Sequence, residues 1–481
     1  MIIASLHDLY RGANNTARSS WICVLFLFTC CLTGCATPHI DIDTPPSVDM
    51  PLAWSGSTLD TKAELPDIDW WRKFGSGELT NLVQEGRRNN YQIGAAISRV
   101  REAQLQAQIA GATLLPEFDI VAGANRQLPI GAGNSTTSAT GVLEVSYEVD
   151  FWGKNRAGFS TAEATLRANE YDRETVNLTV TCSIVSTYLE VLSLRDRLAI
   201  ARDMVGNAEH VLALLQSQSQ AGAASSLDLA RQRSVVADQQ AMLPYLQQQE
   251  RDALTALAIL LGRNPENFTI AGSGLAAIQM PPIAPGLPSE LLTRRPDIEH
   301  VEAQLTAANA NIEAARAAMF PSIYLTGSAG GQSNALLSLF NGQNLMANIG
   351  SSLIAPIFNG DALKNAHKLA IEKKREMVQV YRGTVINALS EVERALSLIQ
   401  SIEDRYKLKK VEVEQAQYAF NLSEIRYRAG AEDLMTVIDT QRSLSDAQNQ
   451  LGQIKLDRLQ ATVSLYKALG GGWKNGDSND R

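Results

Sequence analysis

The chain has 481 residues, of which 20% are charged, and its formal net charge is −8. This length is enough for two or three domains, and the acidic balance excludes the basic surface that a nucleic-acid-binding protein needs. The 33 glycines and 16 prolines are clustered rather than spread, which excludes a collagenous or disordered chain.

The first predicted element is a signal peptide over residues 1–34. Arg11 and Arg18 precede an apolar run, WICVLFLFTCCL, that is too short to span a bilayer and suits an export signal. The run ends in LTGC, which resembles the bacterial lipoprotein box, so Cys35 is the expected lipidation site. Ala36 follows it, and the absence of an Asp there points to the outer membrane. The alternative is an ordinary signal peptide that happens to contain a cysteine.

Cysteine usage agrees with export. Three of the five cysteines would be removed with the signal, and Cys35 would carry lipid. Only Cys182 would remain, so no intrachain disulfide is expected. Because Cys182 lies in a helical pattern, it is predicted to be a buried small residue.

Proline and glycine mark three less regular parts of the mature chain. A lipidated, extended N-terminal segment is expected over residues 35–75, and an equatorial linker over residues 264–290. The polar, glycine-rich tail over residues 471–481 is expected to be flexible. Two long segments remain, 76–263 and 291–470.

These two segments are predicted to be copies of one another, produced by a tandem duplication. When Pro116 is aligned with Pro321, the alanines and isoleucines before them match as well. Apolar residues spaced by seven also recur: Ile184, Val191, Leu198, Val205 and Leu212 correspond to Val392, Ile399, Tyr406, Val413 and Phe420. A strict seven-residue period is typical of coiled-coil packing.

Each copy is expected to contain the same elements in the same order. A first helix, at about 76–114 or 297–319, leads into two strand-like segments. A very long helix follows, at about 156–219 or 362–428, and a glycine-containing turn joins it to a return helix. A helix of that length would extend about 95 Å, which ordinary globular domains do not use.

The strand-like segments alternate apolar and polar residues. In GVLEVSYEVD (141–150) one face is apolar and the other is largely acidic, and the segments EFDIVAGANR, PSIYLTGSAG and ANIGSSLIAP repeat the theme. Each is near ten residues long, as transmembrane β-strands are. The polar link over residues 127–140 is expected to be an external loop.

Four strands cannot close a barrel, and an open edge in lipid would leave backbone groups unpaired. The barrel is therefore expected to be shared, with three chains supplying twelve strands. Pro116 and Pro321 mark the points where a helix stops and a membrane strand starts, because proline cannot continue a helix. The alternative is a soluble protein with four short hairpin strands.

Four motifs resemble the TolC-type outer-membrane efflux proteins, in particular the lipoprotein branch that serves resistance-nodulation-division (RND) pumps. They are LLTRRPDIEHVEAQLTAANANIEAARAAMFPSIYL (291–325), WWRKF (70–74), DFWGK (150–154) and YRAGAEDLMTVIDTQRSL (427–444). The resemblance covers nearly the whole mature chain, from about Trp70 to Leu469.

This resemblance implies a mixed α and β membrane protein that assembles as a homotrimer. A twelve-stranded β-barrel in the outer membrane would continue into a long periplasmic α-helical barrel. The expected partners are outer-membrane lipid, a periplasmic membrane-fusion adaptor and an inner-membrane RND transporter. The family has no chemistry of its own, so no cofactor is expected.

The two helix turns would form the periplasmic tip. Gly222 and Gly430 fit positions that need left-handed backbone geometry, and family adaptors dock at these turns. Ser226 and Asp433 are expected to cap the helices that follow. The plainer interpretation is that the glycines only make the turns.

In the family, side-chain links between neighbouring helices hold the closed tip. Tyr427 matches the latch tyrosine and Asp228 its partner, although Asp228 could instead only favour a helix N-terminus. Asp439 matches one acidic ring position that would attract cations. Thr436 stands where some members carry a second Asp, so Glu432 and Asp433 are candidates for the acidic rim.

The motif formed by Arg294, Arg295, Pro296 and Asp297 looks catalytic but is predicted to be structural, since Pro and Asp suit a first helical turn. The histidines show no metal-ligand spacing, and no nucleophile or phosphate-binding motif is present, so an enzyme is not expected.

We therefore expect a passive, gated export duct for small molecules in a tripartite pump. The alternatives are a duct for type I protein secretion and a non-conducting coiled-coil lipoprotein scaffold. The sequence leaves the cargo open.

Overall fold

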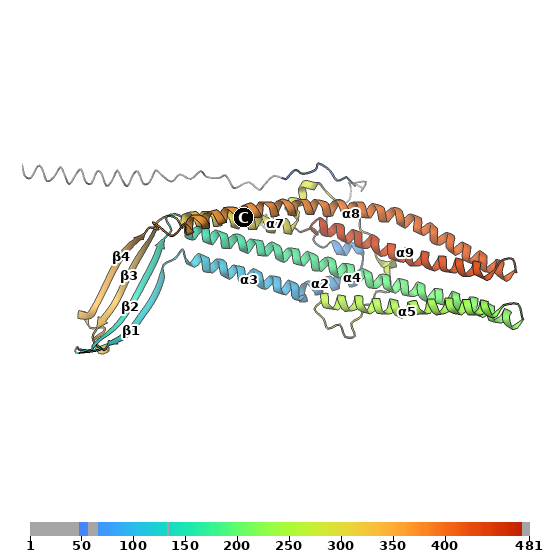
Figure 1. Cartoon of the computed structure of the whole chain (residues 1–481), viewed down its shortest axis with the longest axis horizontal. Helices are drawn as coiled ribbons and strands as arrows, with labels where there is room; N and C mark the ends of the chain where they lie inside the picture. The colour runs from blue at the N-terminus through green and yellow to red at the C-terminus, as the bar shows by residue number, and fades with distance from the viewer. Residues whose placement is uncertain (1–47, 56–65, 132–133, 474–481) are drawn as a thin grey trace, which may run out of the picture. The chain divides into compact units, whose positions relative to one another are not determined.

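The computed structural model describes residues 48–55, 66–131 and 134–473 (Figure 1). The expected signal peptide and Cys35 lie outside the described residues. Within residues 48–473, four strands lie at one end of the helices, and the turns between the longest helices and their return helices lie at the other (Figure 1).

The two halves contain corresponding elements, as a tandem duplication predicts. The first half contains α2 (Gly77–Asn89), α3 (Tyr91–Ala112), β1 (Glu117–Gln127), β2 (Thr136–Val149), α4 (Lys154–Gln220) and α5 (Ser226–Leu260). The second contains α6 (Leu291–Arg294), α7 (Pro296–Ala317), β3 (Ser322–Ser333), β4 (Leu345–Ile354), α8 (Ala362–Arg428) and α9 (Leu434–Ala468). Short 3₁₀ helices include η1 (Trp70–Phe74), η4 (Leu336–Ser338) and η5 (Gly342–Asn344).

Two expected boundaries were wrong. The helix predicted over residues 76–114 is two helices, because Asn90 adopts extended backbone geometry and its side chain accepts from the backbone N–H groups of Gln92 and Ile93. The loop predicted over residues 127–140 is shorter, because β2 already begins at Thr136. The polar side chains there mimic a loop, while their backbone pairs with β1.

The sheet is antiparallel in the order β1-β2-β3-β4, and its register gives two different faces. One face is mainly apolar and includes Phe118, Ile120, Leu143, Val145, Leu325, Ile349 and Leu353. The other includes the four acidic residues of the strands, Glu117, Asp119, Glu144 and Glu148. β1 and β4 are the two edges.

The helices pack side by side around α4. It contacts α3 and α7 toward the strand end, and α5 and α9 toward the turns, while α8 packs against α7 and α9. Among the described helices, α4 alone is long and apolar enough to cross a membrane, but half of its most apolar window is buried in the protein.

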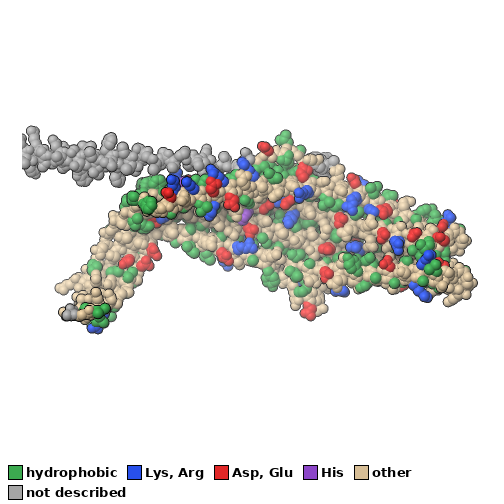
Figure 2. Space-filling model, in the orientation of Figure 1, with side chains coloured by type: hydrophobic (Ala, Val, Ile, Leu, Met, Phe, Trp, Pro, Cys, Tyr) green, Lys and Arg blue, Asp and Glu red, His purple; other side chains and the backbone are tan. Residues whose placement is uncertain are grey.

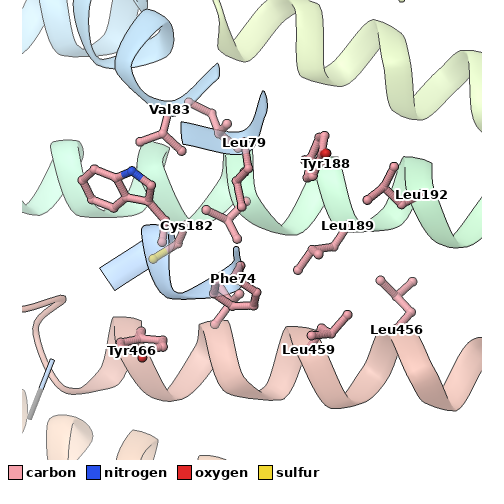
Figure 3. Close-up of a cluster of buried hydrophobic side chains, with 14 of the residues drawn as sticks. Phe74, Leu79, Val83, Cys182, Tyr188, Leu189, Leu192, Leu456, Leu459 and Tyr466 are labelled. Atoms are coloured by element: carbon pink, nitrogen blue, oxygen red, sulfur yellow. The ribbon is translucent and has the colours of Figure 1, made fainter. Parts of the chain in front are cut away.

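A large apolar core joins η1 and α2 to α4 and α9 (Figure 3). Leu79 and Val83 of α2 lie beside Cys182 of α4, and Phe74 of η1 lies between α4 and α9 (Figure 3). Trp70 stacks on Tyr466, with ring centroids 4.5 Å apart. The predicted burial of Cys182 is confirmed. The WWRKF segment is likewise a packing element.

Equivalent hydrogen bonds connect the end of each return helix to the start of the helix that precedes the strands in the same half. They join α5 to α3 and α9 to α7. Asn90 donates from Nδ2 to the Leu260 carbonyl at 2.8 Å, and Arg295 donates from Nη1 to the Ala468 carbonyl at 2.9 Å. Both side chains also stand at the N-terminus of the next helix. The two halves thus share this connection, although different side chains make it.

Arg295 is the most connected residue of the RRPD motif. Its guanidinium also binds both Asp297 oxygens, at 3.0 and 2.7 Å, and a Glu391 oxygen at 2.7 Å. Burial would lower the pKa of Arg295, but these carboxylates outweigh burial and raise it. The structural role predicted for this motif is confirmed.

Candidate gate at the helix tips

The turns after α4 and α8 have the same backbone. Gly222 and Gly430 adopt φ values of +77° and +71°, in the left-handed region that favours glycine. In each turn the next N–H reaches back five residues, from Ala223 to the Gln218 carbonyl and from Ala431 to the Arg426 carbonyl. This closes both helices with the Schellman pattern. The turn role predicted for the glycines is confirmed.

Side chains cap the return helices differently. Ser225, not Ser226, caps α5, and it forms a capping box with Asp228. The Asp228 backbone N–H donates to Ser225 Oγ at 3.1 Å, and Asp228 Oδ2 accepts from the Ser225 backbone N–H at 3.2 Å. Ser226 is already the first helical residue, which is why the expected position was wrong by one.

Asp433 caps α9, as expected, by accepting from the Thr436 backbone N–H at 2.9 Å. This hydrogen bond lowers the pKa of the Asp433 carboxyl. Thr436, at the position where some members carry Asp, donates its hydroxyl to Asp433 and to Glu432.

Tyr427 links the two long helices. Its hydroxyl donates to Gln218 Oε1 at 2.8 Å, so α8 is tied to α4. Burial, and after it the charge of Asp228, raises the pKa of Tyr427. Asp228 itself is engaged in its capping box, and a direct Tyr427–Asp228 bond stays a prediction.

A second link lies beside the first. Arg428 donates from Nη2 to His210 Nε2 at 2.7 Å and to Glu424 Oε1 at 2.5 Å. His210 belongs to α4, whereas Glu424 and Arg428 belong to α8. Sequence reasoning missed this cluster and Gln218, because no local pattern connects positions more than 200 residues apart. The proximity of Arg428 to Tyr427 was the one available signal.

The remaining predicted tip residues lie close by. Glu432 is half-buried and pairs with Arg426, with Oε2 and Nε 3.3 Å apart. Asp439 is exposed on α9, two turns beyond the Asp433 cap. Among the described residues, no group of His, Cys, Asp and Glu could hold a metal ion.

Below the links, a separate apolar cluster packs the two helical hairpins together. It contains Met204, Val211, Leu215, Phe420, Leu434, Val437, Ile438 and Leu444. The tip is thus a packed unit whose outermost connections are a few partly exposed polar contacts. Such contacts can exchange partners without unfolding the cluster beneath them.

Comparisons with known proteins define the class. The family model "Outer membrane efflux protein" matches residues 82–263 and 287–471. Solved structures agree: the Campylobacter jejuni CmeC outer membrane channel has a TM-score of 0.84 at 24% identity, covering 90% of this chain and 95% of that one. A membrane protein from Pseudomonas aeruginosa has a TM-score of 0.80 at 30% identity, covering 90% and 99%. The chain belongs to the outer membrane efflux protein family.

Among curated relatives, the pyoverdine export outer membrane protein OpmQ of Pseudomonas aeruginosa is 43% identical over 426 residues, covering 86% of this chain and 90% of the relative. Outer membrane protein OprJ of the same species is 31% identical, covering 90% and 92%. The protein is therefore an outer-membrane efflux channel with the TolC-like fold. The predicted fold class and location are confirmed, and the family's members are not enzymes.

Proposed function

We propose that this protein is the passive, gated outer-membrane duct of a tripartite RND efflux pump. An adaptor would dock at the Gly222 and Gly430 turns, and an inner-membrane transporter would supply the energy. The observation that carries the gate is the pair of side-chain links between α4 and α8, made by Tyr427 and Arg428.

The strength of these links suits a gate. A hydrogen bond of this kind contributes about 0.5–1.5 kcal/mol net, so two links in each of three chains hold the tip closed while each remains breakable. The partner of Tyr427 would be Gln218 within the chain, with Asp228 as the alternative partner that the family latch implies. Asp439, with Glu432 and Asp433, would line the narrow entrance with negative charge and favour cations.

The gate is tested by measuring entry of a hydrophilic dye into cells that lack the native gene and its pump. The Tyr427→Phe, Gln218→Ala, Asp228→Ala variant should admit dye that the wild type excludes. Ser225→Ala is the matched control, because it breaks the α5 capping box but leaves the Asp228 carboxylate and the links in place. Equal dye entry in all three strains would refute the latch.

The cargo is proposed to be a pyoverdine-type compound. Two relatives named for pyoverdine export are 43% and 42% identical to this chain, whereas OprJ is 31% and the cation efflux protein CusC 29% identical. A deletion strain should retain the compound in the periplasm, as measured by mass spectrometry of cell fractions. Unchanged secretion together with increased drug sensitivity would assign the duct to drug export instead.

Cys35 is proposed to carry the lipid anchor. One relative is named a probable outer membrane lipoprotein, SilC, at 29% identity. Mass spectrometry of the mature N-terminus should show acylation at Cys35, and Cys35→Ser should remove it. An unmodified N-terminus at another position would support the ordinary signal peptide.

The two alternative functions are less well supported. A type I protein secretion duct shares the fold, but OpmQ is named for pyoverdine export and CusC for cation efflux. A non-conducting scaffold would not require a sheet with one apolar and one acidic face.

A further inference from the structure

The β3–β4 connection, residues 334–344, is unusually apolar for an external loop. It contains NALLSLFNGQN, and no charged residue occurs anywhere between Arg316 and Asp361. Leu336, Leu337 and Phe340 are largely exposed, with Leu337 fully so. Hydrophobic side chains are visible at the free end of the sheet (Figure 2).

This connection folds onto the apolar face of the sheet. Leu339 is only 6% exposed, and a Cβ on Gly141 would lie 3.1 Å from its Cδ2. A Cβ on Gly331 would collide with the Leu339 carbonyl. Gly141 and Gly331 face each other in the register and lie on the same side as Leu143 and Val145.

At this level β1, β2 and β3 have only small side chains. Ala122, Gly141 and Gly331 form one row across the apolar face, which Leu345 of β4 completes, and Ala124, Ala139 and Ser333 form the next. Every row nearer the helices has a large apolar side chain. Leu339 and Phe340 of the connection therefore supply the apolar bulk that β1, β2 and β3 lack there.

The register also gives the depth at which the connection would lie in the membrane. Gly141 and Val149, near the helix end of β2, are about 26 Å apart along the strand, or about 20 Å along the membrane normal for a tilt of about 40°. That is within an apolar band about 25 Å tall. Arg126 lies on the same face, about 13 Å further along the strand than Ala122, where a guanidinium would meet anionic head groups.

The backbone of the connection is suited to lipid as well. Two 3₁₀ turns pair part of it internally, through bonds such as Ser338 N–H to the Ala335 carbonyl and Leu339 N–H to the Leu336 carbonyl. Asn344 Nδ2 donates to the Ser338 carbonyl at 2.7 Å, and the hydroxyls of Ser333 and Ser338 are 2.6 Å apart. Unsatisfied backbone groups each cost several kcal/mol in hydrocarbon, so these hydrogen bonds lower the cost of holding the connection at the edge of the apolar layer while its side chains insert.

We propose that residues 334–344 form a lipid-facing wedge, in which Leu336, Leu337 and Phe340 insert among the acyl chains of the outer leaflet. The wedge continues the apolar face of the sheet outward and fixes the depth of the barrel in the outer membrane. It is independent of the gate and of the cargo.

The test is spin-label accessibility in vesicles of phosphatidylethanolamine and phosphatidylglycerol. A nitroxide at Leu337→Cys should collide with oxygen several-fold more often than with a water-soluble nickel complex. Ile349→Cys, 97% exposed on the apolar face, is the lipid control, and Ser135→Cys, exposed at the end of the β1–β2 connection, is the aqueous control. The protein without an added cysteine gives the background, since Cys182 is buried.

A Leu337 label that behaves like the Ile349 label supports the wedge, and Phe340→Cys should repeat the result. A label that behaves like the one at Ser135 places the connection in water and overturns the proposal. A label protected from both reagents overturns it too, because another protein surface, such as a second copy of the chain, would then cover the connection.

Discussion

The buried guanidinium of Arg295 joins the start of α7 to α8 and to the end of α9. Only a planar group with several N–H donors can serve Asp297, Glu391 and the Ala468 carbonyl at once. The motif resembles catalytic machinery because both need clustered charge, but here one guanidinium is paired with two carboxylates in a helix joint.

Replacing Arg295 by Met should lower the free energy of unfolding by about 2–3 kcal/mol, because the two carboxylates and the carbonyl lose their partner. The loss is smaller than for a fully buried pair, since the Glu391 side chain is half exposed. Arg295→Lys keeps the positive charge but not the planar group with several N–H donors, so it should lose less stability than Arg295→Met but still some. Thermal unfolding of the detergent-solubilised protein measures both. Equal stability of wild type and Arg295→Met would contradict this role.

Cys182 offers a test of the core. Burial raises the pKa of its thiol from 9.0 to about 12. At pH 8 the native thiolate is roughly a thousand-fold scarcer than in the unfolded chain, so iodoacetamide should modify Cys182 only after unfolding. The raised pKa also means that stability is kept below pH 9 and falls as the pH rises above it. Rapid alkylation of native protein at pH 8 would show an open core.

Residues of the gate were only partly predictable. Tyr427 and Asp228 could be placed from the aligned turns, but the structure pairs Tyr427 with Gln218 and Asp228 with Ser225. Gln218 and His210 could not, because their partners come from a helix far along the chain. Hydrogen bonds between distant side chains depend on tertiary packing, which no local period encodes.

The glycines after the helices separate two kinds of constraint. Gly222, Gly262, Gly430 and Gly470 all have positive φ. A Cβ on Gly222 or Gly430 would meet open space, whereas one on Gly262 or Gly470 would collide with the carbonyl of Asn89 or Arg294. The first pair is needed for backbone geometry alone, and the second pair also for a close helix joint.

Gly222→Ala should therefore cost about 1 kcal/mol, the price of left-handed geometry. Gly262→Ala should cost about 3 kcal/mol or more, because overpacking adds to the same strain. Thermal unfolding of the two variants side by side measures the difference. Equal losses of stability in the two variants would mean that the backbone around Gly262 and Asn89 relaxes to accept the added Cβ.

The long elements were the most predictable. The helices expected over 156–219 and 362–428 differ from α4 and α8 by at most two residues at either end, because a seven-residue apolar period persists along them. The start of β2 was not predictable from its polar side chains. It is fixed by pairing with β1 and β3, which is a property of the assembled sheet.

At the scale of the whole molecule, the two open sheet edges, β1 and β4, require partners from other copies of the chain. In the expected trimer, β4 of each chain would pair with β1 of the next, which would leave no edge in lipid. Four strands per chain predict a shared barrel, and the family resemblance implies that three chains share it. The wedge at the outer rim required the register, which places Leu339 beside Gly141 and Gly331.

The two faces predict opposite tolerance to charge. Ile349→Arg places a guanidinium on the lipid face near mid-bilayer and should destabilise the inserted barrel by about 2–4 kcal/mol. Asn348→Arg, one residue earlier, points to the other face and should cost much less. Denaturant unfolding in lipid vesicles measures both. A larger loss of stability for Asn348→Arg than for Ile349→Arg would mean that the lipid-facing side has been assigned to the wrong face of the sheet.

The most direct test of a gated duct is ion conductance across planar bilayers, comparing the wild type with Tyr427→Phe, Gln218→Ala, Asp228→Ala. The account predicts that wild-type trimers conduct little and that the variant opens a large, steady conductance, because the Tyr427–Gln218 link between α4 and α8 is gone. Large conductance in both would contradict the gate, and silence in both, with insertion verified, would contradict the duct itself.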